Sequence, residues 1–313
     1  MKQRVRIGTS GYSYPGPAPQ GWYGVFYPEK KAKKFDELAF YSSFFDSVEI
    51  NSTFYRPPAP GMAEAWAKRS PADFEFAVKV WQKFTHPMKL GEETGEKGRN
   101  WEAPTQADVE LFKRGVGPLS DCGKLGVLLF QYPPGFHYSE ENAEKLGWTL
   151  DVFKDYPKAV ELRHRSWSDK GAETKRLLGQ CGATWAVIDE PKFASSVVQG
   201  FEPMGNIFYL RLHGRNREKW WSHKEAWERY DYFYGPEEIR SLAGGVGEAA
   251  EKSPRAKIYV LFNNHARGQA VADAVMLKRE LGQEVAAALP ESLVRAYPQL
   301  AGFGRVQDRD TLF

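Results

Sequence analysis

Phe208-Tyr209-Leu210-Arg211-Leu212-His213 is the stretch that decides the fold, because its polar residues, Arg211 and His213, stand two positions apart at the end of an apolar run. Successive side chains of a β-strand point to opposite faces, so this strand would have one apolar face and one face that turns polar at its C-terminal end. The pattern recurs in Val48-Glu49-Ile50-Asn51, Phe76-Ala77-Val78-Lys79, Val160-Glu161-Leu162-Arg163-His164 and Tyr259-Val260-Leu261-Phe262-Asn263. It is typical of a parallel barrel with its active site at one rim.

The rest of the chain alternates between segments with strand-like and helix-like patterns. Strands are expected near residues 4–9, 47–51, 74–80, 125–131, 158–164, 184–189, 207–213 and 257–263. Helices are expected over residues 33–45, 61–69, 105–119, 139–154, 169–180, 236–252 and 269–281, with Ser139 and Ser168 as start signals. About eight such βα units within ~250 residues predict an α/β protein with a closed (β/α)8 TIM barrel. An open doubly wound sheet is the alternative, but no Gly-x-Gly-x-x-Gly fingerprint follows the first strand.

The 313 residues are interpreted as one domain, with the barrel over about 4–282 and a C-terminal extension over about 283–313. Long segments rich in glycine, proline, aromatic and charged residues follow three strand ends, at 10–32, 82–104 and 214–235. Loops on that rim carry function in this architecture, so these segments are expected to form the walls of the site.

The composition excludes some classes of protein. A formal net charge of +3 and a pI near 8.6 are too mild to indicate nucleic-acid binding by themselves. No apolar run reaches the ~18 residues that span a bilayer, and the N-terminal residues lead directly into a strand instead of forming a signal peptide. We therefore expect a cytoplasmic protein with no membrane partner.

Three carboxylates at strand ends are candidates for proton transfer: Glu49, Glu161 and Asp189. The strands that carry Glu49 and Glu161 would lie on opposite sides of the ring, so the two carboxylates could face each other across a substrate. The structural alternative pairs Glu49 with Lys79 and Glu161 with Arg163 inside the barrel. An ionised carboxylate in a barrel interior is costly, which favours a functional role.

Three cations at strand ends, Lys79, Arg163 and Arg211, balance those carboxylates and favour an anionic ligand such as a phosphate. His213 is the best candidate among the histidines for proton transfer, because it shares a strand face with Arg211. No His-x-x-x-His or Glu-x-x-His spacing predicts a metal site, so a divalent metal is possible but not favoured, and no organic cofactor is implied.

Several motifs closely resemble the YecE-like family, also called domain of unknown function 72. They are Gly8-Thr9-Ser10-Gly11-Tyr12, Trp22-Tyr23-Gly24-Val25-Phe26-Tyr27-Pro28, the stretch from Val48 to Arg56, Phe130-Gln131-Tyr132-Pro133-Pro134, the stretch from Val160 to Trp167, Tyr209 to Arg215, Tyr230-Asp231-Tyr232 and Phe262-Asn263-Asn264. The resemblance covers nearly the whole chain. It implies a TIM barrel of unestablished activity, and the comparison of this family with the barrel of endonuclease IV suggests a nucleic acid or phosphodiester ligand.

Many relatives of that family end in a short tail that resembles the motif binding the DNA sliding clamp. This chain keeps Leu312 and Phe313 but places Gln307 too early for the motif, so clamp binding is a minor possibility beside a frayed terminus.

The leading hypothesis is an enzyme that binds or hydrolyses a phosphate-bearing or nucleic-acid-derived ligand at the rim. A glycosidase or sugar isomerase with paired carboxylates is a second reading, and a non-catalytic ligand-binding or adaptor protein is a third. The candidate catalytic residues are Glu49, Glu161, His213 and Asp189. The candidate ligand-binding residues are Asn51, Tyr55, Lys79, Gln131, Arg163, His164, Arg211, Asn263 and Asn264.

Overall fold

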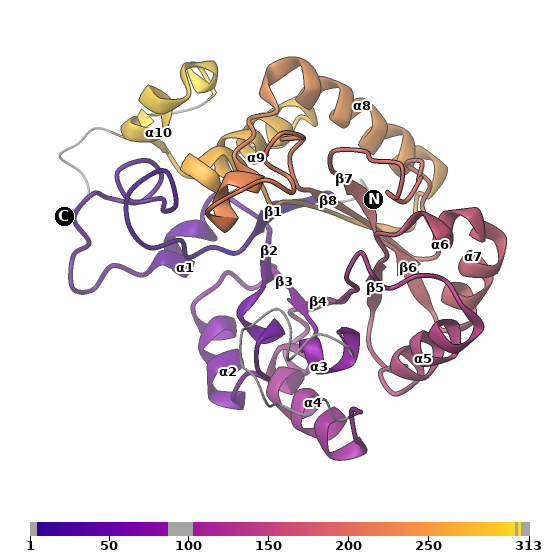
Figure 1. Cartoon of the computed structure of the whole chain (residues 1–313). Helices are drawn as coiled ribbons and strands as arrows, with labels where there is room; N and C mark the ends of the chain where they lie inside the picture. The colour runs from indigo at the N-terminus through magenta and orange to yellow at the C-terminus, as the bar shows by residue number, and fades with distance from the viewer. Residues whose placement is uncertain (1–4, 87–102, 304–305, 308–313) are drawn as a thin grey trace.

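A ring of parallel strands lies at the centre of the protein, as Figure 1 shows for this computed structural model. The structure describes residues 5–86, 103–303 and 306–307. The strands of the ring are β1 (Val5–Ser10), β2 (Ser47–Ile50), β3 (Glu75–Lys79), β4 (Leu125–Gln131), β5 (Lys158–Glu161), β6 (Ala183–Trp185), β7 (Val187–Asp189), β8 (Ile207–Leu212) and β9 (Lys257–Phe262). The sheet order β6-β5-β4-β3-β2-β1-β9-β8-β7 confirms the predicted barrel architecture.

The ring returns on itself because one predicted strand is divided between two neighbours. Residues 184–189 were expected as a single strand, but β6 pairs with β5 and β7 pairs with β8. The change of partner occurs at Ala186, whose N–H still donates to the carbonyl of Val160 at 2.9 Å. The barrel is therefore nearly closed, with its sixth strand position in two pieces.

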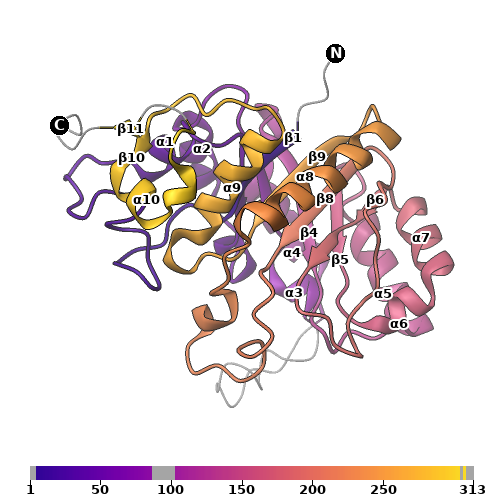
Figure 2. The ribbon, with the colours of Figure 1, turned by 90° about the horizontal axis from the view of Figure 1, so that it is seen from above.

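Helices cover the outside of the ring, and each predicted helix has a counterpart. They are α1 (Glu37–Tyr41), α2 (Pro60–Lys68), α3 (Gln82–Thr85), α4 (Gln106–Asp121), α5 (Glu140–Asp151), α6 (Arg165–Asp169), α7 (Gly171–Gln180), α8 (Gly235–Lys252), α9 (Gln269–Glu280) and α10 (Glu291–Ala296). Figure 2, turned by 90°, shows α8 and α9 side by side along the barrel wall. Within the part of the chain that the structure describes, no helix is long and apolar enough to span a membrane.

Two helix boundaries differ from the prediction for local reasons. The helix expected at 33–45 is shortened to α1, because the Asp36 side chain accepts the N–H groups of Leu38 and Ala39 and so starts the helix later. The helix expected from 169 is preceded by α6, which His164 caps by accepting the N–H of Ser166 through Nδ1 at 3.2 Å. Ser139 caps α5 as predicted.

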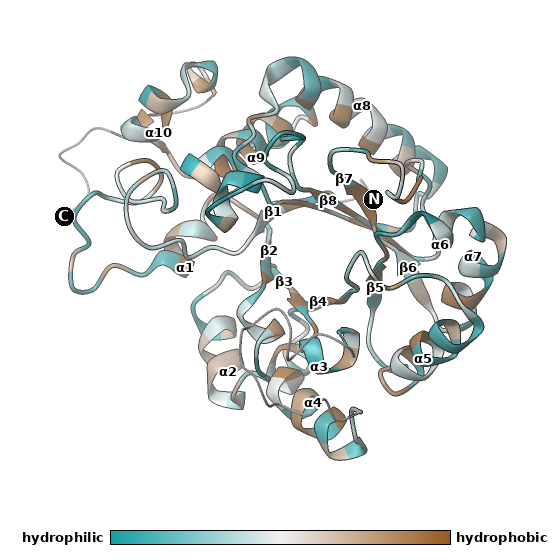
Figure 3. Ribbon diagram, viewed as in Figure 1, coloured by the Kyte–Doolittle hydropathy of each residue, from teal (hydrophilic) through white to brown (hydrophobic). Residues whose placement is uncertain are grey.

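Side chains inside the ring form a core distinct from the one beneath the helices. The interior core consists of Ala77, Val127, Leu129, Ala159, Ala186, Tyr209, Tyr259 and Leu261. The larger core lies between the strands and the helices and includes Val48, Phe76, Leu128, Val160, Leu210 and Val260. Figure 3 shows the largely apolar strands of the ring enclosed by helices that carry both hydrophilic and hydrophobic residues. This alternation is what the strand pattern predicts, since neighbouring residues of a strand face opposite sides of the sheet.

The C-terminal extension packs against the barrel near the first long loop. Ser292 in α10 donates its hydroxyl to the carbonyl of Val25 at 2.8 Å, and Tyr297 donates to the carbonyl of Arg267 at 2.8 Å. A short parallel pair of strands, β10 (Leu289–Pro290) and β11 (Val306–Gln307), belongs to this extension. Leu312 and Phe313, the residues considered for clamp binding, lie outside the described residues.

Candidate functional site

Six of the predicted site residues meet at the C-terminal rim of the barrel. One lateral partner of Glu49 is Ala77, on β3, and one lateral partner of Arg211 is Leu261, on β9; both belong to the interior core. Glu49 and Arg211 therefore extend into the ring, as the same-face argument predicts. We call the group the rim cluster; its members are Glu49, Lys79, Glu161, Arg163, Arg211 and His213.

Arg211 lies between the two carboxylates of the cluster. Its Nε and Nη2 bind Oε2 and Oε1 of Glu49 at 2.9 and 2.6 Å, and its Nη1 binds Oε2 of Glu161. Tyr209 donates its hydroxyl to Oε2 of Glu49 at 2.8 Å. Both carboxylates are fully buried, with 0% exposure. Arg211 is thus saturated with carboxylate partners, and Glu49 pairs with it instead of with Lys79, the partner considered from the sequence.

Arg163 is bound less completely than Arg211. Its Nε donates to Oε1 of Glu161 at 2.6 Å, which confirms the pairing considered from the sequence. Its Nη1 lies 3.4 Å from Oε2 of Glu190, and its Nη2 lies 3.3 Å from Nε2 of His213. These two contacts are long, so the Nη groups keep donors for a further partner.

The carboxyl groups of Glu161 and Glu190, which both contact Arg163, have pKa values shifted in opposite directions. Burial disfavours the ionised form of Glu161, but Arg163 and Arg211 outweigh it and hold the pKa of this carboxyl well below its usual range. Burial raises the pKa of Glu190, and Arg163 offsets only part of that effect. Glu161 is therefore a fixed negative charge, whereas Glu190 binds a proton more readily.

Lys79, at the end of β3, has no anionic partner within residues 5–86 and 103–303. Its Nζ lies 3.8 Å from the centre of the Phe54 ring, and among the described residues it makes no hydrogen bond or ion pair. Burial, assisted by Arg211 and opposed by Glu49 and Glu161, lowers the pKa of Lys79 to about 7. A cation at this position is partly exposed and has no counter-ion in the described part of the chain.

His213 is neutral in this environment. Its side chain is fully buried, and Nε2 lies 3.3 Å from Arg163 Nη2 and 3.7 Å from Glu161 Oε2. Burial and the charges of Arg163 and Arg211 lower the pKa of His213 to about 3. Nδ1 lies 2.9 Å from the side-chain amide of Asn263, which orients the ring. At neutral pH the imidazole is therefore uncharged and serves as a hydrogen-bonding group, because its surroundings oppose protonation.

Aromatic rings of the loop 214–235 lie beside His213, and a ring of the loop 10–32 joins them through His265. The ring centres of Trp220 and Tyr230 each lie 6.4 Å from that of His213. Tyr14 stacks on His265 at 4.6 Å, and His265 lies 5.2 Å from Tyr230. The segments 10–32 and 214–235 therefore contribute a wall to the rim, as expected. Of the third predicted wall, 82–104, residues 87–102 lie outside the described residues.

Some predicted site residues lie away from the cluster or contribute no polar contact to it. Asp189 accepts hydrogen bonds from Arg215 at 2.7 Å and from Tyr234 at 2.8 Å, on the outer side of the sheet. His164 stacks on His137 with ring centres 3.7 Å apart. Asn264 donates to Oδ2 of Asp273 at 2.6 Å.

The remaining predicted residues stand near the rim. Tyr55 is 71% exposed beside Phe54. Gln131 donates to the carbonyl of Tyr132 at 2.9 Å, and Asn51 directly follows β2 at the start of a 3-10 turn, η1 (Ser52–Phe54). These three positions suit contact with a ligand larger than the rim cluster itself.

Five residues near the cluster were not predicted. Tyr209 shares a strand face with Arg211, so the same parity rule would have found it, and Glu190 directly follows Asp189. Ser10 is the other lateral partner of Glu49, and its fully buried Oγ has no hydrogen-bond partner among the described residues. Tyr14 and Tyr230 lie in loops, where no periodic pattern indicates direction.

The metal hypothesis finds no additional support in the described residues. Among them, no group of three or more His, Cys, Asp or Glu side chains has the arrangement of a metal site.

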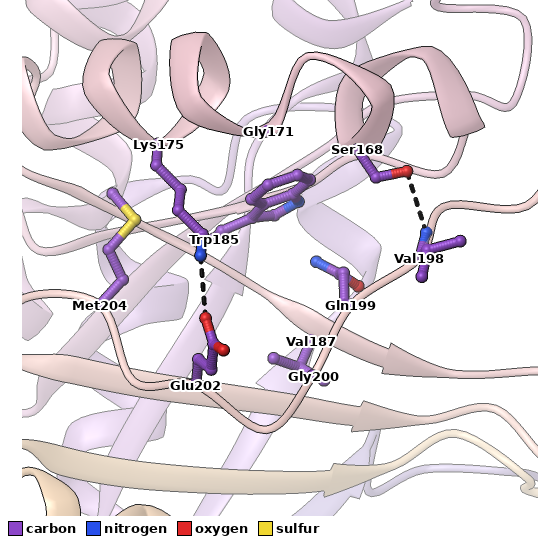
Figure 4. Close-up of a pocket in the computed structure, with 10 residues that line it drawn as sticks. All are labelled: Ser168, Gly171, Lys175, Trp185, Val187, Val198, Gln199, Gly200, Glu202 and Met204. Atoms are coloured by element: carbon purple, nitrogen blue, oxygen red, sulfur yellow. Dashed lines mark hydrogen bonds and ion pairs between the residues drawn. The ribbon is translucent and has the colours of Figure 1, made fainter.

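A cavity of about 240 Å³ lies away from the rim, beside α7 (Figure 4). Its charged side chains are paired, with Lys175 Nζ 2.8 Å from Glu202 Oε2, and the Val198 N–H donates to Ser168 Oγ at 3.1 Å. Trp185 forms one wall, and its buried Nε1 has no partner within the described residues. With its charges neutralised, this cavity lacks the unpaired cation that the rim cluster offers.

Comparisons with known proteins place the chain among relatives of similar length. A family model described as a protein of unknown function, DUF72, matches residues 6–296. The Bacillus subtilis protein YunF (UPF0759) is 29% identical in an alignment 293 residues long, and the alignment covers 90% of this chain and 98% of YunF. A DUF72 protein structure from Thermotoga maritima is 33% identical, covers 89% of this chain and 99% of its own, and superimposes with a TM-score of 0.71. One from Enterococcus faecalis is 25% identical, with 90% and 96% coverage and a TM-score of 0.74.

Proposed function

This chain belongs to the DUF72 family of proteins of unknown function, and from that premise we propose that it is an enzyme whose rim cluster binds a small anionic ligand, with phosphate-bearing compounds as the leading class. The observation that carries the proposal is the unequal pairing of the three cations. Arg211 is saturated by Glu49 and Glu161, whereas Lys79 has no carboxylate partner among the described residues. An unpaired cation at a barrel rim favours an anion that arrives with the ligand.

Arg163 is the second group that would hold the anion. Its two Nη groups make only long contacts, at 3.3 and 3.4 Å, and a guanidinium can offer paired donors to phosphate or carboxylate oxygens. The sequence suggested that Arg211 also binds the anionic ligand. In this proposal Arg211 has a different role, because it holds Glu49 and Glu161 in place.

Proton transfer in such a reaction would fall to Lys79, whose pKa of about 7 lets the neutral amine accept a proton near neutral pH. His213 has a pKa of about 3, so it stays neutral there and would hold the ligand or Arg163 by a hydrogen bond instead. The glycosidase reading is weaker, because a retaining or inverting enzyme needs one protonated carboxyl, and Glu161 has a lowered pKa. The partly exposed rings of Tyr14 and Tyr230 favour a ligand with a ring, such as a sugar phosphate or a nucleotide.

The proposal is tested by thermal unfolding of the full chain with inorganic phosphate, a nucleoside monophosphate and a sugar phosphate. At least one of these ligands should raise the melting temperature of the wild type. Lys79→Met should remove that shift. Lys83→Met should keep it, because Lys83 already pairs with Asp108 at 2.8 Å.

The proposal would be weakened if none of the three ligands raised the melting temperature of the wild-type protein. An equal shift in wild type and Lys79→Met would also contradict it, because the anion would then bind elsewhere.

A further inference from the structure

We propose that Lys79 is an amine nucleophile, which forms a Schiff base with an aldehyde or ketone group of the anionic ligand. The inference rests on the proposed function, because it places a carbonyl compound in the same rim cluster. It adds the reactive group of the substrate, which the anion site alone does not specify.

Lys79 differs from the buried lysines of the described chain in its contacts. The Nζ of Lys124 donates to two carbonyls and the Ser70 hydroxyl, at 2.7 to 3.0 Å. The Nζ of Lys158 lies 3.2 to 3.3 Å from three carbonyls, and that of Lys278 lies 2.8 Å from Asp46. These amines are held as structural donors. Among the residues that the structure describes, the Lys79 Nζ contacts the Phe54 ring, and the side chain is partly exposed, so a ligand can reach it.

The surroundings of Lys79 favour the neutral amine, which is the form that attacks a carbonyl. Arg211 and Arg163 place positive charge near it, and the carboxylates that could stabilise an ammonium, Glu49 and Glu161, are already bound to these guanidinium groups. A lysine in an apolar site next to other cations is activated in this way. The same contacts therefore explain both the free Nζ and its reactivity.

The chemistry of this step balances without any oxidant or reductant. The Nζ lone pair forms a bond to the carbonyl carbon, and one amine proton moves to the oxygen to give a carbinolamine. The C–O bond then breaks, water leaves with a second proton from nitrogen, and an imine remains.

The substrate class is then a carbonyl compound that also carries an anionic group. The open Nη donors of Arg163 would bind the phosphate or carboxylate, while the carbonyl carbon meets Lys79. A phosphorylated aldehyde or ketone, or a 2-oxo acid, has both features.

Borohydride trapping tests this inference directly. The full chain is incubated with dihydroxyacetone phosphate, glyceraldehyde 3-phosphate or pyruvate, reduced with sodium borohydride, and examined by intact mass and peptide mapping. We expect one adduct per chain, on Lys79, formed at least about tenfold faster than on any other lysine. Lys79→Arg should lose it, and Lys83→Arg should retain it.

Labelling spread over exposed lysines, or absent from Lys79 with all three probes, would overturn the inference. If phosphate still raises the melting temperature of the same preparation and Lys79→Met abolishes that shift, the anion site stands and only the nucleophile is rejected. If both trapping and the thermal shift fail, the proposed function is rejected with it.

Discussion

Arg211 binds Glu49 through two parallel hydrogen bonds, Nε to Oε2 at 2.9 Å and Nη2 to Oε1 at 2.6 Å. Both side chains are buried at the barrel mouth, so neither charge is stabilised by bulk water. A buried ion pair of this kind contributes little net stability compared with apolar residues, yet removing one partner leaves an uncompensated charge. The pair is therefore a rigid frame that fixes where the other groups of the rim cluster stand.

Replacing Arg211 should show how strongly the two buried carboxylates depend on its guanidinium group. Arg211→Met leaves Glu49 and Glu161 without their shared cation, and we expect the free energy of unfolding to fall by about 3–5 kcal/mol. Urea denaturation measures the change. Lys145→Ala, which removes an exposed pair with Glu141, is the control and should cost less than about 1 kcal/mol. Equal effects of the two substitutions would show that Arg211 is dispensable for the frame.

Tyr209 is the third donor to Glu49, and its hydroxyl can be removed without changing the ring. Tyr209→Phe should lower the free energy of unfolding by about 1.5–3 kcal/mol, because a buried hydrogen bond to a charged group is lost. Tyr55→Phe is the matched control, since Tyr55 is 71% exposed, and it should be nearly neutral. A neutral Tyr209→Phe in the same denaturation series would refute the assignment.

Lys79 should lower the stability of the protein at neutral pH. Its pKa falls from an ordinary 10.5 to about 7 in the folded state, so the unfolded chain binds more protons between these values and stability rises with pH there. Lys79→Met should therefore raise the melting temperature most at or below pH 7, and the gain should vanish near pH 10.5. A gain that did not depend on pH would contradict this explanation.

Asp273 should show the opposite pH dependence. Burial, opposed by the hydrogen bond from Asn264, raises the pKa of Asp273 from 3.8 to about 8, so the folded state retains a proton that the unfolded state has lost. Stability should fall as the pH rises from about 4 to about 8. Asp273→Asn, which mimics the protonated acid, should raise the melting temperature by several degrees at pH 8 and have little effect at pH 4. Asp169→Asn, at an exposed position, should have little effect at either pH.

The strand pattern predicted much of the rim cluster. Because side chains alternate along a strand, Glu49, Glu161 and Arg211 could be placed on the inner face from spacing alone, and the structure brings them together. The pattern did not identify the partners. Glu49 was matched with Lys79 by neighbouring strand position, but the longer, forked side chain of Arg211 reaches both carboxylates from the other side of the ring.

Asp189 illustrates why a position at a strand end is not sufficient to predict a site residue. The chain changes neighbours at Ala186, and Asp189 then pairs with Arg215 and Tyr234 outside the ring. The aromatic wall of Tyr14 and Tyr230 was equally inaccessible from the sequence, since loop residues have no period that gives their direction.

The sequence by itself determined the parallel barrel and the inner faces that carry Glu49, Glu161 and Arg211, because these depend on local alternation and on the short connections between strands and helices. Only the tertiary structure decided which charges neutralise one another at the rim. Pairing across a ring depends on side-chain length, direction and burial, which are set when distant strands meet. That difference is why the polar strand ends could be located from the sequence, whereas the unpaired amine of Lys79 emerged only from the folded protein.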